Sequence, residues 1–165
     1  MPILDAHSID FVSHSADQTQ RLGMRLGELL SGEDLICLAG ELGAGKTTLA
    51  AGIARGWGAL DRPSSPGFVI VNEYRRADRA VLYHLDAYRL SGPQEAWAAG
   101  VGDLFDGRGD LLVEWPERIL EALPPERLWI TLGWVEEQKR SLHFEAAGSR
   151  YQRLLDGFRQ AAFGR

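Results

Sequence analysis

One short segment constrains the fold of this chain more than any other feature of its sequence. Residues 40–47 read Gly-Glu-Leu-Gly-Ala-Gly-Lys-Thr, which matches the pattern G-x-x-x-x-G-K-[ST] in full. The apolar residues 35–39 precede it, and Leu49 and Ile53 follow it at helical spacing. A buried strand, a glycine-rich loop and a helix in this order are typical of a phosphate-binding P-loop. The segment therefore predicts an α/β fold.

Each part of this loop has a physical reason to hold phosphate. Glycines let successive backbone N–H groups point inward, and the following helix directs its positive end to the same place. We expect Lys46 to reach the β- and γ-phosphates and Thr47 to bind the Mg²⁺ that bridges them. The bare pattern occurs by chance roughly once in a few hundred chains of this length. The residues expected to bind ATP or ADP are consecutive, namely Glu41, Leu42, Gly43, Ala44, Gly45, Lys46, Thr47 and Thr48.

The rest of the chain alternates between strand and helix patterns. Strands are predicted at residues 9–12, 35–39, 68–75, 80–85, 110–114, 128–135 and 142–146. Helices are predicted from the N-cap Ser15 to about Leu30, where Gly32 ends the first one, and at residues 46–57, 93–99 and 151–163. We expect one P-loop NTPase domain over residues 1–165. Its sheet should be mixed and largely parallel, flanked by helices, with antiparallel hairpins.

Composition argues against several classes of protein. The net charge of −5 disfavours a free-standing nucleic-acid binder. Arg75, Arg76 and Arg79 are interpreted as a solvated turn between strands, although a local basic patch is the alternative. No apolar run approaches the roughly 20 residues that span a bilayer, and no secretory signal is visible, so we expect a cytoplasmic protein without membrane contact. The single cysteine, Cys37, has no disulfide partner and is expected to be an inert core residue.

Two carboxylates follow predicted strands and are candidates for catalysis and for magnesium binding. Glu114 ends an apolar strand in the manner of a Walker B acid, and Asp86 follows another strand. The pattern leaves open whether the strand before Asp86 is antiparallel, and a solvated loop acid is the alternative for each. His84 either orients Asp86 or a water molecule, or is structural. Arg89 is interpreted as part of a structural ion pair rather than as a charge stabiliser.

Several segments, taken together, resemble the TsaE (YjeE) family of bacterial P-loop ATPases, which is required to form threonylcarbamoyladenosine in tRNA. The resemblance extends over about residues 8–135. The matching segments are residues 15–30 with 40–49, Ser65-Pro66-Gly67-Phe68 with Val71-Asn72-Glu73-Tyr74, His84-Leu85-Asp86-Ala87-Tyr88-Arg89-Leu90, and Glu114-Trp115-Pro116-Glu117.

The resemblance implies site roles and partners. Asp86 would lie at the metal and nucleotide, Glu114 would serve the metal or the attacking water, and Trp115 would lie close to the nucleotide. Residues 65–66 would form a switch-like loop, in which Gly67 replaces the usual threonine and removes a hydroxyl that could contact magnesium or the γ-phosphate. The implied partners are TsaB and TsaD, which transfer the threonylcarbamoyl group to tRNA. Slow ATP hydrolysis, stimulated by these partners, would reset their complex.

Two other functions compete with this one. A small-molecule kinase on this scaffold generally closes a lid with several arginines, whereas residues 91–109 contain only Arg108. A nucleotide-dependent binding module with negligible turnover is kept open by Gly67. The chain also lacks the Asn-Lys-x-Asp signature of common GTPases, which favours adenine weakly. Stimulation of hydrolysis by the partners would distinguish these hypotheses.

Overall fold

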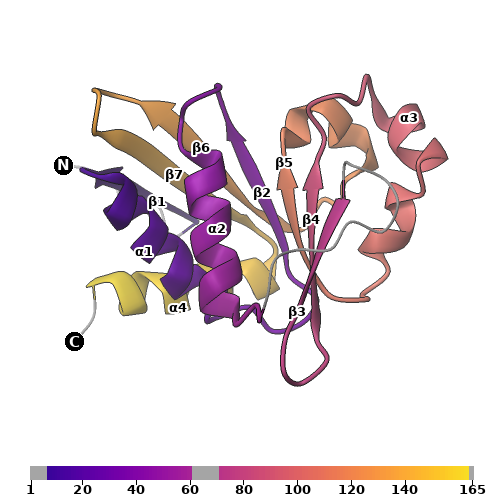
Figure 1. Ribbon diagram of the computed structural model, residues 1–165, viewed down its shortest axis with the longest axis horizontal. Coiled ribbons are helices and arrows are strands. Elements are labelled where there is room, and N and C mark those ends of the chain that lie inside the picture. Colours follow the sequence, from indigo (N-terminus) through magenta and orange to yellow (C-terminus); the bar gives the residue numbers. More distant parts are fainter. Residues whose placement is uncertain (1–6, 61–70, 164–165) are drawn as a thin grey trace.

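The protein is built around one twisted sheet with helices packed on it, as the computed structural model shows for residues 7–60 and 71–163 (Figure 1). The strands, in sheet order, are β1 (Ser8–Ser13), β7 (Arg140–Ala147), β6 (Arg127–Trp134), β2 (Leu35–Gly40), β5 (Asp110–Glu114), β4 (Val81–Asp86) and β3 (Val71–Arg75). The helices are α1 (Ala16–Gly27), α2 (Lys46–Trp57), α3 (Pro93–Ala98) and α4 (Ser149–Phe163). Two 3₁₀ segments, η1 (Val101–Phe105) and η2 (Pro116–Ala122), complete the described elements.

The sheet is parallel in its centre and antiparallel at both sides. Strands β6, β2, β5 and β4 run parallel, while β3 pairs antiparallel with β4, and β7 pairs antiparallel with β6 and β1. This confirms the mixed α/β fold class and both predicted hairpins. The central strands β2 and β5 consist almost entirely of buried residues, because layers cover both faces of a central parallel sheet.

Most element positions follow the sequence patterns, with two differences. The prediction that the first helix reaches Leu30 is wrong, since α1 ends at Gly27 and the chain continues in tighter turns, in which the N–H of Leu30 donates to the carbonyl of Gly27. The segments η1 and η2 are missed, because such short turns carry no clear hydrophobic period. Residues 68–70 of one predicted strand lie outside the described residues.

The predicted cap of α1 is present in a modified form. The Ser15 hydroxyl accepts a hydrogen bond from the N–H of Gln18 at 3.0 Å, as expected for an N-cap serine. The Gln18 side chain reaches back to the N–H of His14 at 2.6 Å, one residue before the position used in a standard capping box. The start of α1 is therefore fixed by local side-chain contacts.

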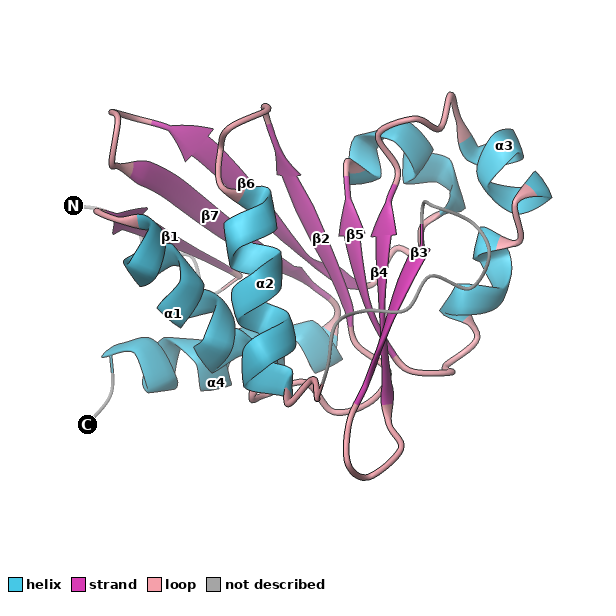
Figure 2. Ribbon diagram, in the orientation of Figure 1, coloured by secondary structure: helices cyan, strands magenta, loops and turns pink. Residues whose placement is uncertain are grey.

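Helices α1 and α2 lie side by side on one face of the sheet (Figure 2). They pack so closely that their backbones are in contact. Four glycines form this contact, spaced four residues apart in each helix: Gly23 and Gly27 in α1, and Gly52 and Gly56 in α2. A Cβ atom added to any of them would lie closer than 3.0 Å to a backbone carbonyl oxygen of the other helix. We refer to these four residues as the glycine seam.

Several predictions about single side chains can be compared with this fold. Cys37 is fully buried, and burial raises the pKa of its thiol to about 12, so the inert core role is confirmed. Arg76 binds Asp78 and lies 4.6 Å from the centre of the Trp57 ring, as expected for a turn rather than a free basic patch. None of the helices in residues 7–60 and 71–163 is long and apolar enough to cross a bilayer.

The glycine seam leads to a stability prediction. Gly56→Ala places a methyl group against the carbonyl of Met24, so we expect the free energy of unfolding to fall by about 1–3 kcal/mol. Urea denaturation measures this change. The matched control is Gly157→Ala in α4, whose added Cβ meets only the Leu29 side chain at 3.8 Å or more. That control should raise stability by up to about 1 kcal/mol, because alanine is the better helix former. If both substitutions changed the free energy of unfolding equally, the close backbone contact at the glycine seam would be contradicted.

Candidate functional site

The loop between β2 and α2 lies where the parallel strands end. Gly40 closes β2, residues 41–45 form the loop, and Lys46 begins α2. Strands β5 and β4 run in the same direction as β2 (Figure 1). Their last residues, Glu114 and Asp86, therefore lie at the same edge of the sheet. Such an edge is where open α/β sheets generally bind ligands.

The backbone of this loop leaves the start of α2 open. Gly45 is the N-cap, with a left-handed φ of 102° and no side chain to accept from the first-turn N–H groups. Position 40 requires a glycine because the backbone of β6 lies close to it. A Cβ atom at Gly40 would lie closer than 3.0 Å to the carbonyl oxygen of Leu132 in β6. The uncapped N–H groups and the helix dipole together make a site for an anion. The side chain of Thr47 is exposed beside it.

Lys46 is held inside the site. Its ammonium group donates to the carbonyl of Gly40 and, at 3.2 Å, to that of Glu41. It also lies 3.8 Å from the centre of the Trp115 ring, a cation–π contact. Burial lowers the pKa of Lys46, and the nearby charges of Glu114, Glu117 and Asp86 oppose that shift. The residue is only 6% exposed, so the structure keeps a nearly buried cation at this edge.

The two predicted carboxylates lie side by side. Asp86 and Glu114 are partners in the register of β4 and β5, which are parallel, so the question of strand direction before Asp86 is settled. The pair is fixed by the backbone, because the N–H of Ala87 donates to the carbonyl of Glu114 at 3.0 Å. Asp86 is exposed, and its side chain accepts from the N–H of Tyr88 at 3.0 Å. Glu114, in contrast, is only 8% exposed.

His84 contacts Glu114 rather than Asp86. Its Nε2 lies 2.6 Å from Oε2 of Glu114, and both side chains are largely buried. The contact crosses from β4 to β5, which are neighbours in the sheet. A histidine donor restrains the carboxylate that it contacts, so His84 holds the Glu114 side chain in place. The sequence suggested Asp86 or water as its partner, because residues two apart on a strand share a face.

Trp115 is the centre of an aromatic group beside Lys46. Its backbone adopts the left-handed region with φ 58°, which is unusual for a bulky residue. The Tyr88 ring lies 4.9 Å from it, and the guanidinium of Arg118 lies 5.3 Å from the Tyr88 ring and 5.9 Å from the Trp115 ring. No role was predicted for Tyr88 or Arg118 from the sequence, although each lies within three residues of a predicted site residue.

The far side of the loop is bordered by the start of α1, the β6–β7 turn and the start of β7, which the sequence did not predict to lie there. A hollow of about 80 Å³ adjoins the start of α2. It is lined by Ser15, Ala16, Thr19, Gly45, Thr48, Glu137, Gln138 and Arg140. Arg140 of β7 donates to the carbonyl of Gly43 at 3.1 Å. No sequence signal could place Arg140 here, because its position depends on the pairing of β7 with β6.

Two further predictions concern residues near this edge. Arg89 is exposed and forms no ion pair with the described part of the chain, so the structural ion pair is not seen there. Residues 65–66, the predicted switch-like loop, and the neighbouring Gly67 lie outside the described residues. Within residues 7–60 and 71–163 there is no cluster of three or more His, Cys, Asp or Glu side chains suited to a metal. A metal at this edge would therefore depend on the Thr47 hydroxyl in addition to Asp86 and Glu114.

Comparison with known proteins identifies the family. The family model described as "Threonylcarbamoyl adenosine biosynthesis protein TsaE" matches residues 13–142. The chain belongs to the TsaE family. The match extends from the start of α1 to β7 and so includes the whole candidate site. The TsaE resemblance noted in the sequence is thereby confirmed.

Individual relatives agree with this membership. A Bacillus subtilis protein named tRNA threonylcarbamoyladenosine biosynthesis protein TsaE is 41% identical over 123 residues, which cover 74% of this chain and 76% of that protein. A Treponema pallidum protein of the same name is 34% identical over 131 residues, covering 79% and 96%. The crystal structure of Bacillus subtilis YdiB superposes with a TM-score of 0.78 at 31% identity, covering 94% of this chain and 96% of that one. The TsaE fold is therefore shared over nearly the whole chain.

The burial of Lys46 leads to a prediction about stability. Because burial lowers its pKa, the folded state disfavours the charged form, and Lys46→Met should raise the free energy of unfolding by about 0.5–2 kcal/mol near neutral pH. The gain should shrink at higher pH, as the pH rises through the lowered folded pKa and the wild-type amine loses its proton. Denaturation without nucleotide or magnesium measures both effects. Lys139→Met, at a half-exposed lysine in the β6–β7 turn, should change stability by less than about 0.5 kcal/mol. A lower free energy of unfolding for Lys46→Met would show that burying the charged amine of Lys46 does not destabilise the protein.

Proposed function

We propose that this chain binds ATP or ADP with Mg²⁺ at the loop 40–47 and hydrolyses ATP slowly. One observation carries the proposal. The uncapped start of α2 and the buried ammonium of Lys46 lie at the same sheet edge as the adjacent carboxylates of Asp86 and Glu114. Anion-binding groups beside paired acids are the elements from which phosphoryl-transfer sites are made.

The chemistry of the residues fits a magnesium nucleotide. The loop N–H groups and the side chains of Lys46 and Thr48 would bind the phosphates, and Trp115 would lie beside them. The metal would be held by Thr47, Asp86 and Glu114. Magnesium takes oxygen ligands and would neutralise charge on the phosphate oxygens. Glu114 would orient the attacking water, while His84 holds Glu114 in place through the 2.6 Å contact.

The assembly partners are proposed from the family. The relatives are named for threonylcarbamoyladenosine biosynthesis in tRNA, and the family model matches residues 13–142 of this chain. We propose that it acts in the cytoplasm with TsaB and TsaD and reaches tRNA only through them. The net charge of −5 supports this indirect contact, because direct binding of tRNA draws on cationic side chains. Hydrolysis would then reset the complex and would take no part in the transfer chemistry.

The deciding experiment measures ATP hydrolysis by the full chain alone and with purified TsaB and TsaD from the same organism. We expect slow turnover alone and stimulation by the pair. Lys46→Ala should abolish both, because it removes the cation that pairs with phosphate. Nucleotide binding without stimulation would overturn the partner assignment and favour a kinase or a binding module. Unchanged ATP affinity in Lys46→Ala would overturn the site itself.

Glu114 allows a separate test of the catalytic assignment. Glu114→Gln keeps the shape of the side chain and removes its charge, so ADP affinity should stay within a few-fold while turnover falls by about 10²-fold or more. Calorimetry and a phosphate-release assay measure the two quantities. Glu121→Gln, at an exposed carboxylate at the end of η2, is the matched control and should keep full activity. Full activity of Glu114→Gln would remove Glu114 from the mechanism.

A further inference from the structure

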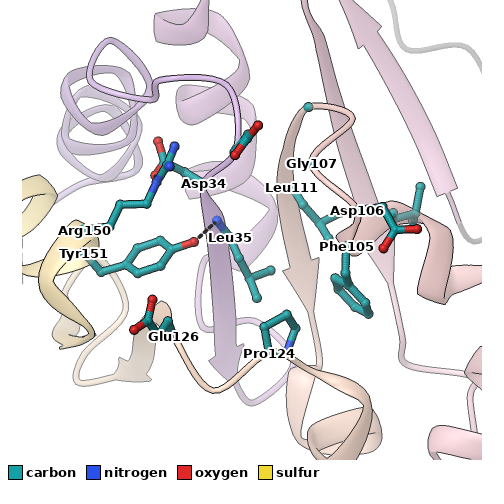
Figure 3. A pocket seen from close by; sticks show the side chains of 13 residues that line it. Asp34, Leu35, Phe105, Asp106, Gly107, Leu111, Pro124, Glu126, Arg150 and Tyr151 are labelled. Carbon is teal, nitrogen blue, oxygen red and sulfur yellow. Dashed lines mark hydrogen bonds and ion pairs between the residues drawn. The ribbon is translucent and has the colours of Figure 1, made fainter.

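A hollow of about 440 Å³ lies at the opposite edge of the sheet from the loop 40–47. Figure 3 shows it from close by. It opens near the starts of β2 and β5, beside Leu35 and Leu111. The end of η1 with the segment after it, the segment before β6 and the start of α4 form its borders. The length of β2 separates it from the loop by roughly 16 Å. Its size is within the range of ligand sites in proteins. No residue of the candidate nucleotide site lines it.

The floor and walls of this hollow are apolar. They are formed by Leu35, Leu104, Phe105, Leu111 and Pro124. Figure 3 shows Phe105 and Pro124 near each other at one end of the hollow and Tyr151 on the side of α4. Leu104 and Phe105 are only partly buried, so apolar surface remains for a ligand to cover. Covering such surface is favourable by about 25 cal/mol per Å².

The rim of the hollow is acidic. Glu33, Asp106 and Glu126 are exposed on it, and none of them forms an ion pair with the described residues. The cation that lines the hollow, Arg150, is already engaged, since its Nε donates to the buried Asp34 at 2.7 Å. A smaller hollow on the other side of this ion pair carries the next cation, Arg153, on its wall. Arg127, whose guanidinium donates to the carbonyl of Pro124 at 3.1 Å, lies beside the hollow, and Arg108 is between Gly107 and Gly109 in the chain. Among the residues that line the hollow, acidic side chains nevertheless outnumber basic ones.

A buried hydroxyl adds a directional group. Tyr151 is 4% exposed and lines the hollow, and its oxygen accepts from the N–H of Leu35 at 2.8 Å. The hydroxyl hydrogen has no acceptor among the described residues. Burial raises the pKa of Tyr151, which keeps this donor protonated. The hollow thus offers a hydrogen-bond donor at its base and carboxylates at its rim.

We propose that this hollow is a docking site for an extended segment of a partner protein that presents an arginine side chain between apolar residues. The guanidinium would meet the carboxylates of Glu33, Asp106 and Glu126, and a backbone carbonyl would accept from Tyr151. The neighbouring apolar side chains would cover Phe105 and Pro124. A nucleic acid does not fit, because the rim would repel its phosphates. The site goes beyond the proposed nucleotide function and does not depend on it.

The test uses the full ¹⁵N-labelled chain and the capped peptide acetyl-Leu-Arg-Leu-amide, followed by amide chemical shifts. We expect shifts at Leu35, whose N–H bonds to Tyr151, and at Gly107 and Gly109 on the wall of the hollow. The same peptide with citrulline in place of arginine keeps the shape without the charge and should bind several-fold more weakly. Saturating ADP and Mg²⁺ should leave the affinity unchanged, since the loop lies at the other edge.

Two charge variants complete the test. Asp106→Asn and Glu126→Gln should each lower the affinity for the arginine peptide by about two- to fivefold, as expected for the loss of one exposed ion pair. Glu136→Gln changes the net charge equally at an exposed residue of the β6–β7 turn and should have no effect. Thermal unfolding confirms that all three variants are folded. The proposal is overturned if the arginine peptide causes no shifts at the hollow, or if the citrulline peptide or the two rim variants bind equally well.

Discussion

The arrangement of this molecule depends on the backbone contact between α1 and α2. The glycine seam lets the two helices approach so closely that a single methyl group at any of its positions would meet a carbonyl oxygen. Because α2 begins at Lys46, the seam also determines where the loop 40–47 lies relative to Ser15 and Thr19 at the start of α1. Close helix packing and the geometry of the candidate site are therefore consequences of the same contact.

The second constraint is the concentration of charge at the carboxyl edge of the parallel strands. A buried lysine is unfavourable by itself, and here it is accompanied by Asp86, Glu114 and the face of Trp115. The His84–Glu114 contact restrains a nearly buried acid next to it. Such an arrangement sacrifices stability for charges held in position, as is common at functional sites. The two edges of the sheet also differ, since the opposite one carries the acidic rim of the larger hollow.

Much of the fold follows from local patterns. The apolar run before Gly40 and the helical spacing after Lys46 are enough to predict β2, the loop and α2. Family membership also follows from short motifs, and the match over residues 13–142 confirms it. The end of α1 is predicted less well, because a leucine such as Leu30 continues the hydrophobic period although the hydrogen bonds have already tightened. Helix ends are decided by such bonds rather than by periodicity.

The sequence by itself determined the candidate residues for phosphate and metal binding, since the loop pattern and the acids after apolar strands, Asp86 and Glu114, are local features. Only the tertiary structure decided how they meet. Parallel pairing places Asp86 beside Glu114. It also brings His84 into contact with Glu114 instead of Asp86. Pairing of β7 with β6 brings Arg140 to the loop. The physical reason is that strand register and helix packing join residues far apart in the chain, and no local pattern encodes those distances.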